Sequence, residues 1–172
     1  QLQAKEDVIS DYSIANQAFE MVYFGLSASN SQRLYTYNLK NDASSCLIDL
    51  SKEILRDVTL GEVQDWNFVS AQGDTIYGRF YLPPHFDATK KYPMIVNYYG
   101  GTTPTARVME SRYPSHVYAG LGYIVYIIQP SGATGFGQEF SARHVNAWGK
   151  LTADEIIEGT KKFCEEHPFV NT

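Results

Sequence analysis

The side chains that could act as general bases in this 172-residue chain are four histidines, His85, His116, His144 and His167. A histidine base needs a nucleophile within hydrogen-bond reach and a carboxylate that orients its ring. The Gly-x-Ser-x-Gly turn that exposes a nucleophilic serine does not occur in the sequence. We therefore assign all four histidines structural or surface roles.

Cys46 and Cys164 are the chain's two thiols. Two cysteines are too few for a disulfide framework, and neither has a metal-like spacing with any histidine. We expect two structural thiols. The sequence implies neither a metal nor an organic cofactor.

The composition narrows the class of partner. The formal net charge is -5, and no run of four or more basic residues occurs, so neither nucleic acid nor an acidic membrane surface is expected. No apolar run approaches 18 residues, which argues against a membrane span. A small molecule, a peptide or a protein is the expected partner. The 13 tyrosines in a 14% aromatic composition favour β-structure.

Residues 1–60 have the pattern of short strands separated by polar turns. Strands are predicted at Ala18–Leu26, Arg33–Leu39 and Ser45–Leu50, at the spacing of an antiparallel meander. Such a meander buries one face only and is marginal alone. Because the turn at Asn38–Asn41 resembles the loops of propeller blades, we interpret this region as the last blade of a β-propeller.

The pattern changes near residue 60. Val63–Ser70 and Thr75–Leu82 predict a hairpin that stops at Pro83. Apolar strands are then expected at Met94–Tyr99 and Ile124–Ile128, with a helix between them over Pro104–Leu121. A strand, a helix and a second strand in this order indicate parallel strands of an α/β sheet.

The last element has the signature of a helix. Thr152 is the expected N-cap, and Glu155 three residues later would complete a capping box. The helix should end before Pro168. An apolar stripe at helical spacing should pack on the sheet through Ile156, Ile157, Thr160, Phe163 and Cys164.

Three segments together resemble the prolyl oligopeptidase and dipeptidyl peptidase family of serine peptidases. They are Tyr98–Gly101, Ser131–Gly137 and Thr152–Asn171, and the resemblance extends over about residues 62–171. It implies the N-terminal half of an α/β-hydrolase sheet in residues 61–172. The antiparallel strands of residues 1–60 would then be a terminal β-propeller segment.

The resemblance also implies roles for individual residues. Tyr99 matches the tyrosine whose hydroxyl helps to form an oxyanion hole, which a phenol at the end of a strand can do. Gly100 and Gly101 would form a turn beside the substrate. Tyr98, whose side chain should point the other way, is expected in the core. Thr102 replaces the proline that usually follows the two glycines.

A second departure concerns the end of the strand Ile124–Ile128. Gln129–Pro130–Ser131 stands where many relatives have Asp-Gly-Arg or Asn-Pro-Arg. The missing arginine puts in doubt any ion pair that the family makes at this turn and suggests a distinct subfamily.

The resemblance implies a parent protein that hydrolyses peptide bonds by Ser-His-Asp acyl transfer, as a dipeptidyl aminopeptidase does. The triad would lie beyond Thr172, so the chain alone would be an inactive fragment. Many bacterial relatives work outside the cytoplasm, so a periplasmic or secreted location is expected. Two alternatives remain: an esterase or acyl-peptide hydrolase of the same fold, and a non-catalytic binding or interaction module.

The family's strand order leaves one edge of Met94–Tyr99 without a neighbour in this sequence. An unpaired strand edge is a template for pairing with another chain. We expect this edge to be covered by a missing C-terminal remainder of the same chain or by a second copy. A peptide substrate is the other expected partner.

Overall fold

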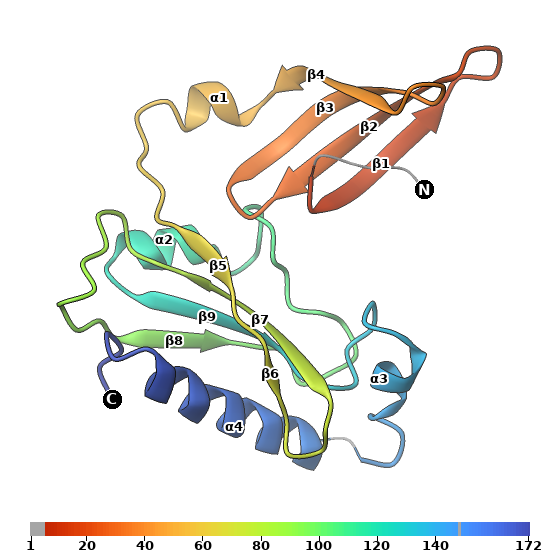
Figure 1. Cartoon of the computed structure of the whole chain (residues 1–172). Helices are drawn as coiled ribbons and strands as arrows, with labels where there is room; N and C mark the ends of the chain where they lie inside the picture. Colours follow the sequence, from red (N-terminus) through yellow and green to blue (C-terminus); the bar gives the residue numbers. More distant parts are fainter. Residues whose placement is uncertain (1–5, 148) are drawn as a thin grey trace. The chain divides into compact units, whose positions relative to one another are not determined.

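The computed structural model describes residues 6–147 and 149–172 (Figure 1). The chain divides into two compact units. The first contains the described residues up to Thr59 together with Arg107–Pro114. The second contains Leu60–Ala106 and Ser115–Thr172.

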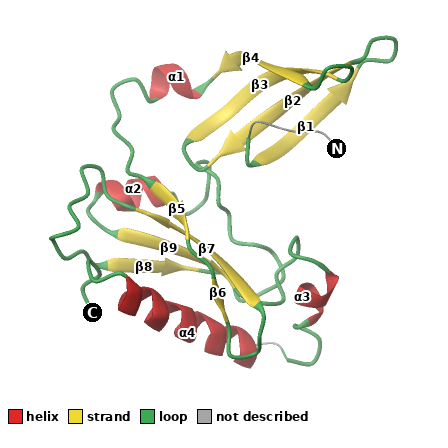
Figure 2. Cartoon of the chain, in the orientation of Figure 1, coloured by secondary structure: helices red, strands yellow, loops and turns green. Residues whose placement is uncertain are grey.

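The first unit is a four-stranded antiparallel sheet with its strands in chain order (Figure 2). Three of the strands confirm the predicted meander, and the fourth, β1, was not predicted. A short helix, α1, follows the sheet at Ser51–Ile54. The strands are β1 Val8–Ile14, β2 Glu20–Ser27, β3 Asn30–Asn38 and β4 Ala43–Asp49.

Alternating residues of β2 and β3 form the core of the first unit. Met21, Tyr23, Tyr35 and Tyr37 are buried on one face of the sheet, as the two-residue period of a strand requires. The rings of Tyr23 and Tyr35 stack with their centroids 5.0 Å apart. This cross-strand pair packs the two central strands together.

The second unit is built on a mixed sheet with the order β5-β7-β9-β8, and β6 pairs with β7 beside β5. Only the β8–β9 pair is parallel. The predicted hairpin and the predicted parallel strand pair are both confirmed. The strands are β5 Val63–Asp65, β6 Phe68–Val69, β7 Thr75–Tyr81, β8 Met94–Asn97 and β9 Ile124–Gln129.

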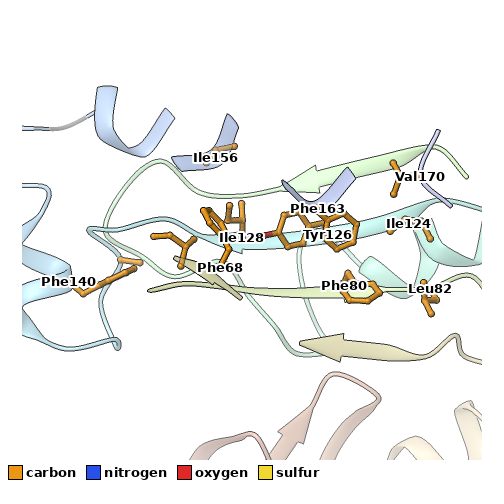
Figure 3. Packing of buried hydrophobic residues seen from close by; sticks show 12 residues of the cluster. Phe68, Phe80, Leu82, Ile124, Tyr126, Ile128, Phe140, Ile156, Phe163 and Val170 are labelled. Carbon is orange, nitrogen blue, oxygen red and sulfur yellow. The ribbon is translucent and has the colours of Figure 1, made fainter. Parts of the chain in front are cut away.

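All six residues of β9 are buried because both faces of the sheet are covered. Helix α4, Lys150–Glu166, packs on the face that carries Tyr126 and Ile128. Its Phe163 ring stacks on Tyr126 with a centroid distance of 4.6 Å (Figure 3). Helix α2, Ser115–Gly120, contacts β9 and β7.

The predicted helix over residues 104–121 is wrong in its first part. Only α2, at the end of that range, is helical, and Arg107–Pro114 belongs to the first unit. The N–H of Met109 donates to the carbonyl of Ser27 at 2.9 Å instead of to a helical partner. This backbone group is therefore satisfied by a contact distant in sequence, which local periodicity cannot reveal.

The predicted capping box is also wrong. Helix α4 already begins at Lys150, after Gly149 with φ of 97°, so Thr152 and Glu155 lie inside the helix and are buried. Instead of capping the helix, the Glu155 carboxylate accepts a hydrogen bond from the N–H of Ser131 at 2.8 Å. A short helix, α3, spans Gln138–Ala142 in the connection between β9 and α4.

Candidate active site

Tyr99 lies just beyond the carboxyl end of β8, which ends at Asn97. Its side chain is 54% exposed. A phenol at this place can present its hydroxyl to a bound molecule while the preceding strand anchors its backbone. The structure therefore leaves Tyr99 available as a hydrogen-bond donor, and its oxyanion-hole role stays a prediction.

Tyr98 is not a core residue, contrary to the prediction. Its side chain is 51% exposed, because the pairing of β8 with β9 ends at Asn97 and no strand continues beneath the ring. Tyr98 instead lines a cavity of about 330 Å³ together with the loop after β8 and the first turns of α4. The other lining residues are Gly100, Gly149, Thr152, Ala153, Ile156 and Ile157.

The two glycines after Tyr99 differ in their surroundings. A Cβ at Gly101 would lie 2.6 Å from Cε1 of Tyr99, so the tyrosine ring rests directly against this glycine. A Cβ at Gly100 would have no atom within 4 Å. Gly101 thus allows the close approach of the ring to the backbone, while the proximity of either glycine to substrate stays a prediction.

Gln129, the last residue of β9, is fully buried and holds the loop that follows Tyr99. Its amide oxygen accepts from the N–H of Thr105 at 2.8 Å, and its amide nitrogen donates to the carbonyl of Thr105 at 2.7 Å. The side chain therefore satisfies both backbone polar groups of one loop residue, as a neighbouring strand would. Sequence reasoning noticed Gln129 only as a departure from the family pattern.

The turn after β9 is fixed from two sides. Thr134 donates to the carbonyl of Thr102 through its N–H at 2.8 Å and through its hydroxyl at 3.1 Å. On the other side, Ser131 is held by Glu155. Burial raises the pKa of the Glu155 carboxyl, although the hydrogen bond from the N–H of Ser131 opposes part of the rise. The turn thus connects α4 to the loop that carries Tyr99.

Two of the histidines make aromatic contacts in the second unit. His116 packs edge-on against Tyr81 at a centroid distance of 5.0 Å. His167 stacks on Phe163 at 4.0 Å, and its Nδ1 lies 2.8 Å from the carbonyl oxygen of Phe163. These contacts agree with the structural roles that the sequence suggests.

Residues 6–147 and 149–172 contain no cluster of three or more histidine, cysteine, aspartate or glutamate side chains that could hold a metal ion. Among the helices of the same residues, none combines the length and the apolar character needed to cross a membrane.

The fold of the chain resembles that of a peptidase of known structure. Acylaminoacyl peptidase from Pyrococcus horikoshii superposes on 99% of this chain with a TM-score of 0.85 at 19% sequence identity. At this identity the match shows the fold alone: an antiparallel sheet and a mixed α/β sheet similar to those of that enzyme. The chain spans 26% of the solved chain.

The sequence comparisons point to one peptidase family. The model of the prolyl oligopeptidase family matches residues 110–172. Dipeptidyl-peptidase 5 of Aspergillus fumigatus is 32% identical over 107 residues, and dipeptidyl peptidase 8 of Mus musculus is 29% identical over 123 residues. These matches cover 62% and 68% of this chain but 14% and 13% of the two relatives. These matches support a relationship to the prolyl oligopeptidase and dipeptidyl peptidase family.

Proposed function

We propose that this chain forms part of a serine peptidase of the dipeptidyl aminopeptidase type, and that Tyr99 donates one of the hydrogen bonds of its oxyanion hole. The observation that carries the proposal is the half-exposed Tyr99 at the carboxyl end of β8. The dipeptidyl peptidases at 29–32% identity support the substrate class.

In this proposal a serine attacks the scissile carbonyl and a histidine accepts its proton, held by an acidic residue. The hydroxyl of Tyr99 donates a hydrogen bond to the oxyanion that forms. This bond stabilises the transition state by about 2.7–4 kcal/mol. The histidine then gives its proton to the leaving amine. Because the sequence lacks Gly-x-Ser-x-Gly, the proposal places the triad outside these 172 residues and gives the chain alone no activity.

The two units have different roles in this proposal. The first is a terminal segment of a β-propeller, which its four antiparallel strands in chain order suit. The second is the N-terminal half of an α/β-hydrolase domain, in which β8 brings Tyr99 to the reacting carbonyl. Peptide substrate is the proposed ligand.

The free edge of β8 is the proposed site for a further strand. Among the described residues, β8 pairs along its length with β9 alone and stands last in the sheet order. Ahead of β8, Tyr92 forms a parallel bridge with Val170: its N–H donates to Phe169 at 2.8 Å, and its carbonyl accepts from Asn171 at 2.8 Å. A strand from the same polypeptide or from a second copy would extend this parallel pairing.

The second candidate is an acyl-peptide hydrolase of the same fold. The acylaminoacyl peptidase of P. horikoshii is the reason to consider it. A non-catalytic binding module is favoured less, because it calls for a packed and buried Tyr99 and this side chain is half exposed.

Labelling with a fluorophosphonate probe, followed by peptide assays, tests the proposal on the whole protein. We expect one labelled serine and release of dipeptides from substrates with a free amino terminus. Preference for N-acetylated aminoacyl substrates would favour the second candidate. Tyr99→Phe should lower kcat by about 100- to 1,000-fold, whereas the control Tyr98→Phe should retain most activity. Absence of labelling, or full activity of Tyr99→Phe, would contradict the proposal.

A further inference from the structure

We propose that Gln129 is a positioning residue, whose side-chain amide fixes the loop that carries Tyr99. The inference rests on the proposed function for its catalytic consequence, but its structural part can be tested without activity. The loop between β8 and the segment Arg107–Pro114 contains neither a helix nor a strand. Its conformation therefore depends on individual contacts.

Gln129 is well placed to supply such a contact. Its backbone pairs with Tyr77 of β7, so the side chain projects from a strand that is buried along its whole length. Both polar atoms of the amide bond to the backbone of Thr105. A buried amide without hydrogen-bond partners would destabilise the folded chain. The pairing therefore strongly favours one position of the Thr105 backbone.

A second attachment connects the same region to the tyrosine ring. Thr134, in the turn after β9, makes two hydrogen bonds to the carbonyl of Thr102. Thr102 directly follows Gly101, against which the ring of Tyr99 rests. The loop is therefore held at Thr102 and Thr105, on the C-terminal side of the ring.

The chemistry of the contact explains why a glutamine is suited to it. The Thr105 backbone offers one donor and one acceptor, so its partner must provide both. A glutamate would accept from the N–H but, when ionised, could not donate to the carbonyl. A methionine has a similar length, cannot donate and accepts only weakly through its sulfur, which makes it the sharper test.

Amide hydrogen exchange of the chain measures the contact directly. In Gln129→Met, the Thr105 amide should exchange about tenfold faster or more. The amides of Ile127 and Ile128 in β9 should stay protected, which would show that the sheet is intact. The matched control Thr134→Val removes a hydroxyl but keeps the N–H bond to Thr102, and should leave exchange at Thr105 unchanged.

If Gln129→Met fails to fold, Gln129→Leu replaces it, because this variant also removes the amide that accepts from the Thr105 N–H. Thr105 should then also exchange about tenfold faster. Exchange at Thr105 as slow as in the original chain, in whichever of the two variants folds, would overturn the proposal.

A double-mutant cycle in the whole protein measures the catalytic consequence. Gln129→Met should lower kcat about tenfold with little change in KM when Tyr99 is present, and about twofold or less in the Tyr99→Phe background. Equal losses in both backgrounds would overturn the positioning role. If Tyr99→Phe alone has no effect, the proposed function fails, while hydrogen exchange at Thr105 still decides whether Gln129 holds the loop.

Discussion

The carboxylate of Glu155 in α4 accepts a hydrogen bond from the backbone N–H of Ser131, 24 residues earlier in the chain, at 2.8 Å. Both residues are buried. The contact attaches the turn after β9 to the helix that covers the sheet. Through this turn, the contact connects α4 to the loop that carries Tyr99.

Glu155 should make the free energy of unfolding fall as the pH rises, which is opposite to the effect of a carboxyl group whose pKa is lowered by folding. Burial raises the pKa of its carboxyl group in the folded chain, so folding favours the protonated form. Stability from this group is fully present below the pKa of the unfolded chain and is lost as the pH rises through the folded pKa. Relative to Glu155→Gln, which stays neutral, the original chain should therefore lose stability as the pH rises from about 4 towards 7.

Glu158 provides the control, because its pKa is lowered by hydrogen bonds from Lys162 and from the N–H of Ala71. Its contribution is present above the unfolded pKa and is lost as the pH falls through the folded pKa. Relative to Glu158→Gln, the original chain should thus gain stability as the pH rises towards the unfolded pKa of about 4, and should change little above about pH 5. Urea unfolding of the three proteins at several pH values measures both trends. If the pH dependence of stability, relative to the original chain, had the same sign in both variants, the opposite pKa shifts of Glu155 and Glu158 would be contradicted.

The glycines of the turn after β9 should differ in their tolerance of a side chain. Gly132 and Gly135 have φ of 96° and 95°, a conformation that disfavours any L-residue. Only at Gly132 would a Cβ also collide with a ring, 1.8 Å from Cδ2 of His144. Gly135→Ala should cost about 1–2 kcal/mol from backbone strain alone, and Gly132→Ala clearly more. Similar losses in thermal unfolding would show that the histidine ring moves away freely.

Gly159 should be required for close packing of α4 on the sheet. A Cβ there would lie 2.5 Å from Cε1 of Phe68 and 2.8 Å from Cδ1 of Ile128. Overpacking of this kind costs about 1–3 kcal/mol, which over most of this range exceeds the gain of about 1 kcal/mol in helix propensity. Gly159→Ala should therefore lower the free energy of unfolding.

The matched control for Gly159 is Gly120, at the end of α2. A Cβ at Gly120 would have no atom within 4 Å, so Gly120→Ala should stabilise by about 0.4–1 kcal/mol. Chemical denaturation measures both variants. A stabilised Gly159→Ala would mean that α4 can shift away from β9 at little cost.

The strands of the two cores could be predicted from sequence because their patterns reflect burial directly. β9 is an apolar run, and β2 and β3 alternate between buried and less buried residues. β1 could not be predicted in this way. All seven of its residues are exposed, and the strand exists through its pairing with β2. Its sequence therefore contains no alternation that a buried face would impose.

The candidate site could be predicted only in part. An apolar strand followed by two glycines locates Tyr99 at a strand end, but the same pattern does not say where pairing stops, and so Tyr98 was placed in the core. The bond between Gln129 and Thr105 joins residues 24 positions apart. The only local signal for it is a polar residue at the end of an otherwise apolar strand, which has no unique interpretation.

The free edge of β8 should make the 172-residue chain self-associate. Tyr92 directs its N–H and carbonyl to Phe169 and Asn171, whereas the carbonyl of Pro93 accepts from Ile124 of β9. Because these groups alternate along a strand, Val96 directs its N–H to the same free side as Tyr92. Val96→Pro should therefore weaken strand addition while keeping the β8–β9 pair, whereas Ile95→Pro should disrupt that pair. Sedimentation velocity over a range of concentrations measures association, and a strictly monomeric original chain at all of them would contradict the prediction.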